Sequence, residues 1–187
     1  MTLKDLKIDP SWTLFLDRDG VINKRIAGDY IRSWDQFIFL PGVQESMSVL
    51  SNIFGKIIVV SNQQGIGKGL MTDEDLEQIH QRMISEIKKG GGRIDKAYHS
   101  PFLEEERSIH RKPNIGMGLK ARKDFPEIRY KKSIMAGDSI SDMIFGRKLK
   151  MKTVFLGDDL TLIRKGHPFI DFAFKDLHEF SKELSTI

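Results

Sequence analysis

The sequence predicts an α/β fold in which a doubly wound, Rossmann-like parallel sheet carries helices on both faces. Short β-rich segments alternate with longer amphipathic segments along most of the chain. Some of the short segments, such as KIIVVS at 56–61, are apolar with little interruption, which is typical of strands buried on both faces of a sheet. The 187 residues suit one full hydrophobic core, so we expect a single domain over 1–187.

The expected elements follow one another in a regular order. Strands are expected at 12–17, 56–61, 94–99, 133–138, 152–157 and 169–174, and helices at 42–54, 72–89, 114–124, 141–149 and 176–184. Thr72 and Asp75 have the spacing of a capping box, and Gly90 follows the end of the same helix. Gly28 and Asp29 give a turn signal, which predicts a small excursion over 27–34. The long loop is expected at 100–111.

Composition and charge narrow the classes of function. The net charge is +4 with basic residues scattered along the chain, which favours a solvated surface over nucleic-acid binding and is compatible with a small anionic substrate. The chain has no cysteine, which excludes disulfides and thiolate chemistry and fits a reducing compartment. No apolar run approaches the length of a membrane span, and the N-terminus lacks the apolar core of a signal peptide. We therefore expect a cytoplasmic protein without a membrane partner.

Polar residues gather at the carboxyl ends of the expected strands, where ligands bind in open α/β sheets. They are Asp17, Arg18, Asp19, Ser61, Asn62, Gln63, Asp138, Ser139 and, one helical turn on, Asp142, with Arg111 and Lys112 just before Pro113. Two like charges about 4 Å apart cost roughly 4 kcal/mol at an effective dielectric near 20. Asp17, Asp19 and Asp138 therefore need a cation if all are ionised, and Mg²⁺ prefers such oxygen ligands. Separate helix or turn capping would explain one isolated aspartate, but not three at corresponding strand ends.

A metal-bound carboxylate beside a lysine and a hydroxyl suits phosphoryl transfer. Magnesium and Lys112 would neutralise a phosphate, while Ser61 and backbone amides would hold its oxygens. Asp17 would attack phosphorus and form an aspartyl phosphate. Asp19 would protonate the leaving oxygen and later take a proton from water. The spacing of the two aspartates thus predicts one nucleophile and one proton carrier.

Four segments, DRDGVIN, VVSNQQGIGKG, RKP and GDSISD, resemble the four motifs of haloacid dehalogenase superfamily phosphatases. With GDYIRSWDQFIFLPGV and HRKPNIGM, they make residues 12–156 similar to the D-glycero-D-manno-heptose 1,7-bisphosphate phosphatase and histidinol-phosphatase family. The resemblance implies a magnesium-dependent phosphomonoesterase that acts on a small phosphorylated sugar. The leading substrate is the heptose bisphosphate, hydrolysed at its 7-phosphate, and histidinol phosphate is the alternative. A monomer without a large cap domain is also implied.

The resemblance also assigns roles to matching positions. Asp17 is the expected nucleophile and Asp19 the expected acid and base, while Ser61 and Lys112 stabilise the phosphoryl group. Magnesium would be held by Asp17, the backbone carbonyl of Asp19, and Asp138, with Asp142 behind these ligands. The residues expected to contact substrate are Arg18, Arg25, Ile26, Ala27, Gly28, Asn62, Gln63, Gln64, Arg111 and Ser139.

The chain departs from the family pattern in two places. The family often has a zinc loop of Cys-x-His followed by Cys-x-Cys, and the corresponding positions here are His99, Pro101, Ser108 and His110. Two imidazoles without thiolates cannot complete a tetrahedral structural site, so zinc is not expected. Ser139 stands where the heptose branch of the family often has lysine. This difference affects the assignment of the substrate and not the expected phosphoryl-transfer chemistry.

Three other interpretations of the sequence compete with a sugar phosphatase. Gly65, Gly67 and Gly69 suggest nucleotide binding, but their spacing matches neither G-x-G-x-x-G nor a P-loop, which favours a turn near the phosphate. A phosphate-binding or phospho-acceptor module without turnover would need no proton donor at Asp19. A nucleic-acid end phosphatase would need a basic patch, and the candidate residues, more simply explained as solvated, are Lys131, Lys132, Arg147, Lys148, Lys150 and Lys152. No nucleic-acid partner is therefore expected.

Overall fold

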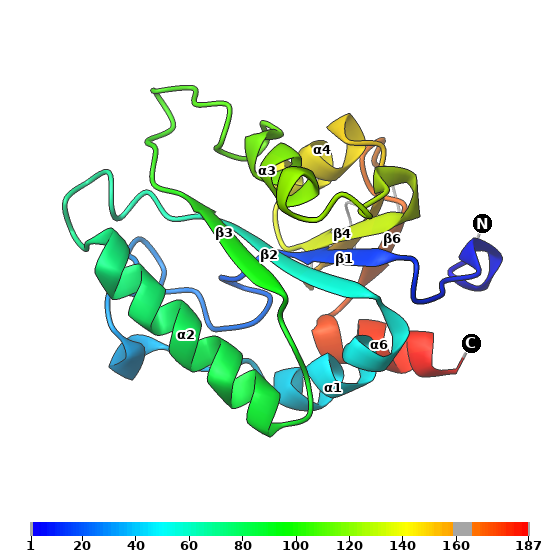
Figure 1. The fold of residues 1–187 in the computed structure, drawn as a ribbon. Coiled ribbons are helices and arrows are strands. Elements are labelled where there is room, and N and C mark those ends of the chain that lie inside the picture. Colours follow the sequence, from blue (N-terminus) through cyan, green and yellow to red (C-terminus); the bar gives the residue numbers. More distant parts are fainter. Residues whose placement is uncertain (1, 159–165, 187) are drawn as a thin grey trace.

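The structure, a computed structural model, describes residues 2–158 and 166–186 and contains one parallel sheet (Figure 1). Its strands within these residues are β1 Thr13–Leu16, β2 Lys56–Asn62, β3 Lys96–Ser100, β4 Ser133–Gly137, β5 Lys152–Leu156 and β6 Phe172–Phe174. They lie in the order β3-β2-β1-β4-β5-β6, and every neighbouring pair is parallel. This is the strand order of a doubly wound Rossmann-like sheet, so the predicted α/β fold class is confirmed.

The helices agree with the predicted ones to within two residues at either end. They are α1 Val43–Ile53, α2 Asp73–Lys89, α3 Gly116–Asp124, α4 Ile140–Lys148 and α6 Leu177–Ser185, with 3-10 turns η1 Lys4–Leu6, η2 Trp34–Gln36 and η3 Tyr130–Lys132. The predicted capping box is present, since the Thr72 hydroxyl accepts from the Asp75 amide and the Asp75 carboxylate accepts from the Thr72 amide. In the described ranges, no helix has both the length and the apolar character needed to cross a membrane.

β6 and α3 begin later than predicted because hydrogen bonds hold the preceding residues in turns. β6 begins at Phe172, since the Thr153 hydroxyl donates to the Phe169 carbonyl at 2.7 Å and the Thr153 amide donates to the Asp171 carboxylate at 3.0 Å. α3 begins at Gly116 because the Asn114 backbone amide donates to the Arg111 carbonyl at 2.8 Å. Asn114 therefore belongs to a turn that precedes the helix.

Alternate residues of the central strands face two separate cores. Leu14, Leu16 and their neighbours on one face of the sheet pack with the apolar residues of α1, α2 and α6. Phe15 and Ile58 face the other way and pack with those of α3 and α4. Figure 1 shows the two groups of helices on opposite sides of the sheet. Since side chains alternate along a strand, burial of both faces explains why these segments are apolar throughout.

The topology determines where a ligand can bind. From β1 the chain moves outward through β2 to β3, and then crosses back to β4 on the other side of β1. The crevice at such a switch point lies beyond the carboxyl ends of the strands. The Asp17 amide extends the β1–β4 pairing by donating to the Ala136 carbonyl at 3.0 Å. The residues that follow β1, β2 and β4 therefore meet at one edge of the sheet.

An excursion between β1 and α1 folds back on itself at this edge. Its base is pinned by a bridge between Asn23 and Phe39, with the Lys24 amide donating to the Ile38 carbonyl at 2.8 Å. Trp34 stacks on Phe37 with ring centroids 4.9 Å apart, and Phe37 meets Phe39 edge-on at 5.0 Å. These contacts tie residues 24–38 into a small insert that extends beyond the predicted excursion of 27–34.

The two-core arrangement predicts how helix leucines contribute to stability. Leu50 of α1 is fully buried, whereas Leu119 of α3 is 45% exposed. Leu50→Ala should lower the free energy of unfolding by about 2–5 kcal/mol because it leaves a cavity. Leu119→Ala, the matched control, should change it by no more than about 0.5 kcal/mol. Urea denaturation of both variants tests this, and equal losses would contradict the placement of α1.

Candidate active site

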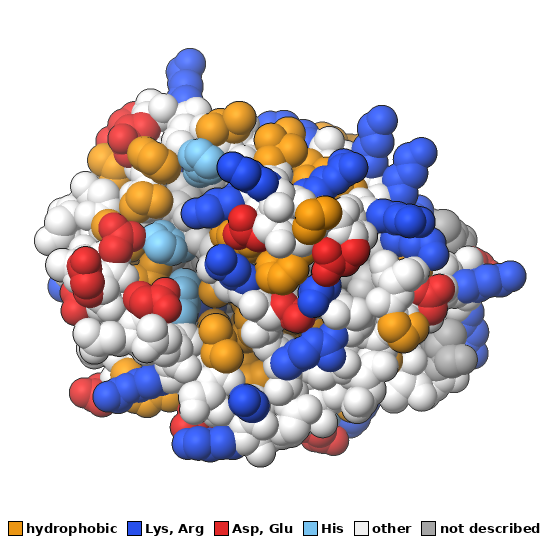
Figure 2. Space-filling view, in the orientation of Figure 1, with side chains coloured by type: hydrophobic (Ala, Val, Ile, Leu, Met, Phe, Trp, Pro, Cys, Tyr) orange, Lys and Arg blue, Asp and Glu red, His pale blue; other side chains and the backbone are white. Residues whose placement is uncertain are grey.

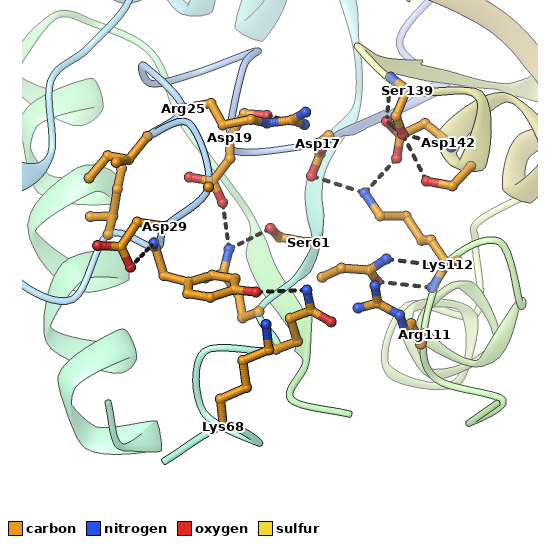
Figure 3. A pocket seen from close by; sticks show the side chains of 18 residues that line it. Asp17, Asp19, Arg25, Asp29, Ser61, Lys68, Arg111, Lys112, Ser139 and Asp142 are labelled. Atoms are coloured by element: carbon orange, nitrogen blue, oxygen red, sulfur yellow. Dashed lines mark hydrogen bonds and ion pairs between the residues drawn. The ribbon is translucent and has the colours of Figure 1, made fainter. Parts of the chain in front are cut away.

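One cavity of about 540 Å³ lies beyond the carboxyl ends of β1 and β2 and next to the start of α4 (Figure 3). Its volume is in the range typical of small-molecule sites. The predicted site residues that line it are Asp17, Asp19, Arg25, Ile26, Gly28, Ser61, Asn62, Gln63, Gln64, Arg111, Lys112, Ser139 and Asp142. Three predicted residues, Arg18, Ala27 and Asp138, lie outside the lining. The structure thus brings segments from four parts of the chain to one place.

Lys112 is the buried cation at the centre of the site. Its ammonium group lies 2.9 Å from an Asp17 carboxylate oxygen and 2.6 Å from Asp142 Oδ1, and it donates to the Val60 carbonyl at 2.7 Å. The Lys112 side chain is only 2% exposed. Burial alone would lower the pKa of Lys112, but Asp142 and Asp17 outweigh it and raise the pKa. Lys112 is therefore held in its charged form next to the Asp17 carboxylate.

The carboxylates of Asp17, Asp138 and Asp142 form an acidic cluster. One oxygen of each lies within 4.8 Å of the others. Burial raises the pKa of Asp17 to about 7, helped by Asp142 and Asp138 and opposed by Lys112. Burial likewise raises the pKa of Asp138 to about 6, and Arg25 opposes the rise. The cluster carries more negative charge than its neighbours offset, which is the condition under which a cation binds.

The acidic cluster differs in one member from the trio predicted to repel one another. Asp142 takes the place of Asp19, whose carboxylate turns away and is neutralised by Arg18 at 2.9 Å. Asp142 also belongs to the capping box of α4, in which its Oδ2 accepts from the Ser139 amide at 3.1 Å. Its two oxygens thus serve different purposes, one capping a helix and one facing Lys112.

Two glycines allow these carboxylates to approach the backbone. Gly20 has a φ of +90°, and a β-carbon there would lie 1.9 Å from Asp138 Oδ2. A β-carbon at Gly137 would lie 2.4 Å from Asp142 Oδ2. Any larger residue at either position would displace a carboxylate of the acidic cluster, and at Gly20 it would also be strained.

Asp19 is held by three hydrogen-bond donors. Its carboxylate accepts from Asn23 Nδ2 at 2.9 Å, from Gln63 Nε2 at 2.6 Å and from Arg18 Nη2 at 2.9 Å. Burial alone would raise the pKa of Asp19, but the Arg18 charge and these hydrogen bonds outweigh it and lower the pKa. The carboxyl group lines the cavity and is held in its ionised form.

The prediction that Arg18 contacts substrate does not agree with its position. Arg18 is fully buried and lies outside the cavity lining. Its guanidinium contacts Asp19, the Gln63 side-chain oxygen at 3.2 Å and His80 Nε2 at 3.4 Å. Burial and the Arg18 charge lower the pKa of His80 to about 3, so His80 faces Arg18 as a neutral ring. Asp17 and Asp19 both line the cavity, whereas Arg18 between them does not. Arg18 therefore orients the Asp19 carboxylate from the side away from the cavity.

The polar residues at the end of β2 hold the groups around them. Gln63 Nε2 donates to the Ser61 hydroxyl at 2.7 Å, which leaves the Ser61 proton free for an acceptor in the cavity. Asn62 pairs with the Lys112 backbone, accepting from its amide at 2.9 Å and donating to its carbonyl at 3.0 Å. Both amides were predicted to contact substrate. Their side chains are instead hydrogen-bonded to the residues predicted to carry the chemistry.

The excursion places Arg25 against the acidic cluster. Arg25 Nη2 lies 2.8 Å from Asp138 Oδ1 and 3.2 Å from the Asp19 carbonyl oxygen. Ile26 and Gly28 line the cavity as predicted, whereas Ala27 between them is exposed and outside the lining.

Several lining residues were not among the predicted ones, namely Asp29, Tyr30, Ile31, Lys68 and Ser141. The Tyr30 hydroxyl accepts from Gln64 Nε2 at 2.7 Å, and Lys68 Nζ lies 5.3 Å from the centre of the Tyr30 ring. Figure 3 shows Lys68 at the opposite end of the drawn residues from Asp17. The turn signal at Gly28 and Asp29 and the glycine-rich stretch 65–69 were the sequence features that pointed to this part of the cavity.

The glycine-rich stretch 65–69 forms successive turns. Its amides are used internally, with Gly67 donating to the Pro101 carbonyl at 3.2 Å, Lys68 to Gln64 at 3.0 Å and Gly69 to Ile66 at 2.8 Å. A phosphate-binding loop needs such amides free to point at the ligand. The arrangement therefore agrees with the turn interpretation and not with nucleotide binding.

The residues at the family's zinc-loop positions make other contacts. His99 Nε2 lies 2.7 Å from an Asp73 carboxylate oxygen, and the His110 ring stacks on Phe102 at 6.4 Å. Arg111 Nη1 donates to the Phe102 carbonyl at 3.4 Å, which links this loop to the cavity. Across residues 2–158 and 166–186, the side chains close enough to share a metal are those of the acidic cluster.

Comparison with known proteins identifies related sequences. Residues 13–176 match the sequence model of a family described as polynucleotide kinase 3 phosphatase. The D-glycero-alpha-D-manno-heptose-1,7-bisphosphate 7-phosphatase of Mycobacterium tuberculosis is 41% identical over 132 residues, covering 71% of this chain and 70% of the relative. The enzyme of the same name from Campylobacter jejuni is 35% identical over 171 residues, or 91% of this chain and 95% of the relative.

Solved structures share the fold. The D,D-heptose 1,7-bisphosphate phosphatase of B. bronchiseptica, complexed with magnesium and phosphate, superimposes with a TM-score of 0.84 at 23% identity. It covers 94% of this chain, and 98% of its own length is matched. A HAD-superfamily hydrolase from Geobacter sulfurreducens has a TM-score of 0.60 at 12% identity, over 92% of this chain and 98% of its own. The α/β fold is therefore that of the haloacid dehalogenase superfamily.

The raised pKa of Asp17 predicts how stability changes with pH in metal-free protein. Between its ordinary value of 3.8 and about 7, the folded state keeps a proton that the unfolded state has lost. Asp17 therefore contributes stability that declines as the pH rises through this range. Asp17→Asn should remove that contribution, so the decline should be smaller in the variant.

Urea denaturation of both proteins with a chelator, at about pH 5 and about pH 7.5, measures the difference. Because Asp138 and Asp19 titrate in both proteins, the comparison isolates Asp17. An Asp17→Asn protein whose stability falls as steeply as that of the wild type would contradict the raised pKa.

Proposed function

Because the chain belongs to the polynucleotide kinase 3 phosphatase family, with a haloacid dehalogenase-type fold, we propose that it hydrolyses the phosphate monoester of a small sugar. The leading substrate is D-glycero-D-manno-heptose 1,7-bisphosphate, cleaved at the 7-phosphate, which is the activity named for relatives that cover most of the chain. The family and the phosphatase class predicted from the four motifs are confirmed. We also propose that the protein acts as a monomer, as the resemblance implies.

The observation that carries the proposal is the setting of Asp17. Its carboxylate lies at the cavity, 2.9 Å from the Lys112 ammonium group and beside the other members of the acidic cluster. A carboxylate so placed can attack an electrophile that Lys112 holds. A phosphate ester is such an electrophile, because its oxygens bind the ammonium group and the Ser61 hydroxyl while phosphorus faces Asp17.

The acidic cluster fits magnesium. Its donor atoms are all carboxylate oxygens, which Mg²⁺ prefers, and they carry excess negative charge. We propose that Asp17, Asp138 and the Asp19 carbonyl hold the ion, since both oxygens of Asp142 are engaged, Oδ1 by Lys112 and Oδ2 by Ser139. When bound, the ion supplies positive charge that keeps Asp17 ionised and offsets the charge of the phosphate.

In the first step, an Asp17 oxygen attacks phosphorus and the bond from phosphorus to the sugar oxygen breaks. Lys112 and Ser61 bind the phosphoryl oxygens as charge develops on them. Asp19 takes up a proton as substrate binds, because the phosphate adds negative charge next to its carboxylate, and it gives this proton to the leaving oxygen. The product of this step is an aspartyl phosphate and a free sugar hydroxyl.

In the second step, water attacks phosphorus and the bond to Asp17 breaks. Asp19 accepts the proton of the attacking water, which needs the ionised carboxylate. The donors Arg18, Asn23 and Gln63 stabilise that ionised form. Inorganic phosphate leaves, and both aspartates return to their starting state.

The outer part of the cavity supports a bisphosphate substrate. Lys68 and Arg111 line it in addition to Lys112, which is proposed to hold the phosphoryl group that is cleaved. A second phosphate on the sugar would find these two cations. Histidinol phosphate, the alternative, has one phosphate and a positively charged amine, for which two cations are unfavourable.

A nucleic-acid substrate has less support. Of the six basic residues considered as a patch, Lys132 contacts Ser11 at 2.8 Å, Arg147 contacts Asp171 at 3.0 Å and Lys148 contacts Asn114 at 3.1 Å. Figure 2 shows basic side chains spread over one face of the molecule and mixed with acidic ones. Such mixing favours a solvated surface over a track for a phosphate backbone.

Replacing Asp17 tests the chemistry. Asp17→Asn should lower kcat by at least about 10⁴-fold, because the amide cannot form the covalent intermediate. Wild-type protein quenched during turnover should carry a phosphoryl group on Asp17, detected by mass spectrometry, and the variant should not. Near-normal turnover by folded Asp17→Asn protein would reject the nucleophile.

Replacing Lys68 tests the substrate class. Lys68→Gln should raise KM for the heptose bisphosphate about five-fold with little change in kcat, because it removes an ion pair to the distal phosphate. The KM for heptose 7-phosphate, which lacks that phosphate, should not change. Lys131→Gln, on η3, is the control for net charge. An equal effect of Lys68→Gln on both substrates would count against distal-phosphate binding.

A further inference from the structure

Arg25 occupies oxygens that the proposed magnesium site needs. A single nitrogen of its guanidinium group lies 2.8 Å from Asp138 Oδ1 and 3.2 Å from the Asp19 carbonyl oxygen. These are two of the three groups proposed to hold the ion. Figure 3 shows the Arg25 side chain reaching over Asp19 in the direction of Asp17. A guanidinium nitrogen and a metal ion cannot both bind the same lone pairs at close range.

The charges around the acidic cluster point to an exchange between the two cations. Three carboxylates face Lys112 and Arg25, which leaves one negative charge uncompensated when all three are ionised. A divalent ion together with Lys112 would neutralise all three carboxylates. Arg25 would then be a surplus cation with no carboxylate of the cluster left to offset, and an anionic ligand would be its favourable partner.

The position of Arg25 in the chain allows it to move. Its side chain is 52% exposed, whereas that of Lys112 is 2% exposed. It lies on the excursion, just beyond the bridge between Asn23 and Phe39 that pins the base of this insert. A long, half-exposed side chain next to a fixed base can change rotamer without disturbing the sheet. Arg25 also lines the cavity, so the new rotamer can stay within reach of a bound phosphate.

We propose that Arg25 is a built-in competitor of the metal ion, which holds Asp138 and the Asp19 carbonyl in metal-free protein and turns to the substrate phosphate when magnesium binds. Metal binding thereby makes a phosphate ligand available that the metal-free protein withholds. The inference rests on the proposed function for the identity of the ion and of the anionic ligand. It adds that metal binding and phosphate binding are coupled through one side chain.

Magnesium affinity without substrate tests the competition. Isothermal titration of chelator-treated protein with Mg²⁺ compares the wild type with Arg25→Gln and with Lys24→Gln. Lys24 is exposed and adjacent on the same excursion, so its variant controls for the loss of one positive charge. Arg25→Gln should bind Mg²⁺ about five-fold more tightly than the wild type, and Lys24→Gln within about two-fold of it.

An Arg25→Gln protein that binds Mg²⁺ no more tightly than Lys24→Gln would overturn the competition. Weaker binding by Arg25→Gln would overturn it too, since Arg25 would then assist the ion. Absence of Mg²⁺ binding by the wild type would instead refute the proposed cofactor. The two failures are thus told apart in one experiment.

Inorganic phosphate tests the second half of the proposal. In saturating Mg²⁺, Arg25→Gln should bind phosphate about five-fold more weakly than the wild type, measured by competitive inhibition and by calorimetry, whereas Lys24→Gln should not. Equal phosphate affinities in Arg25→Gln and the wild type would contradict the proposal that Arg25 moves to the substrate phosphate.

Discussion

The contact of the buried Lys112 ammonium group with Asp17 and Asp142 is the interaction on which the arrangement of this site depends. A buried cation is stable only when it is paired and hydrogen-bonded, and Lys112 meets both conditions through two carboxylates and the Val60 carbonyl. Those partners come from β1, from the start of α4 and from β2, so the pairing fixes three segments relative to one another. The fourth segment is the one that carries Lys112. Asn62 fixes it, because the Asn62 side chain is hydrogen-bonded to the backbone of Lys112.

The two aspartates of the first motif are kept chemically different by their surroundings. Asp17 shares its environment with two more carboxylates, and burial raises its pKa to about 7. Asp19, two residues away, has Arg18 and two amides as donors, which lower its pKa. Neighbouring groups of one residue type can thus serve as nucleophile and as proton carrier. The difference is made by the donors around Asp19, namely Arg18, Asn23 and Gln63, which stabilise its ionised form.

The excursion after β1 and the loop before α3 supply the parts of the cavity that a minimal sheet would lack. Arg25 and Tyr30 come from the excursion, and Arg111 comes from the loop, where its guanidinium group contacts the Phe102 carbonyl. Both segments are irregular, and both are held by side-chain contacts. These are the aromatic packing around Trp34 in one segment and the stacking of Phe102 on His110 in the other. Such segments can change the ligand while the sheet and its carboxylates stay the same.

The sequence by itself determined the order of strands and helices, the capping box at Thr72 and the convergence of Asp17, Lys112 and Asp138, because these follow from local patterns and from strand ends that meet at one edge. Only the tertiary structure decided what each side chain contacts. Arg18 was predicted to meet substrate but is buried, Asp142 joins the acidic cluster in place of Asp19, and Arg25 reaches Asp138, 113 residues away in the chain. Periodicity and motif spacing report burial and backbone conformation, whereas contacts between distant side chains depend on rotamers and packing that no local pattern contains.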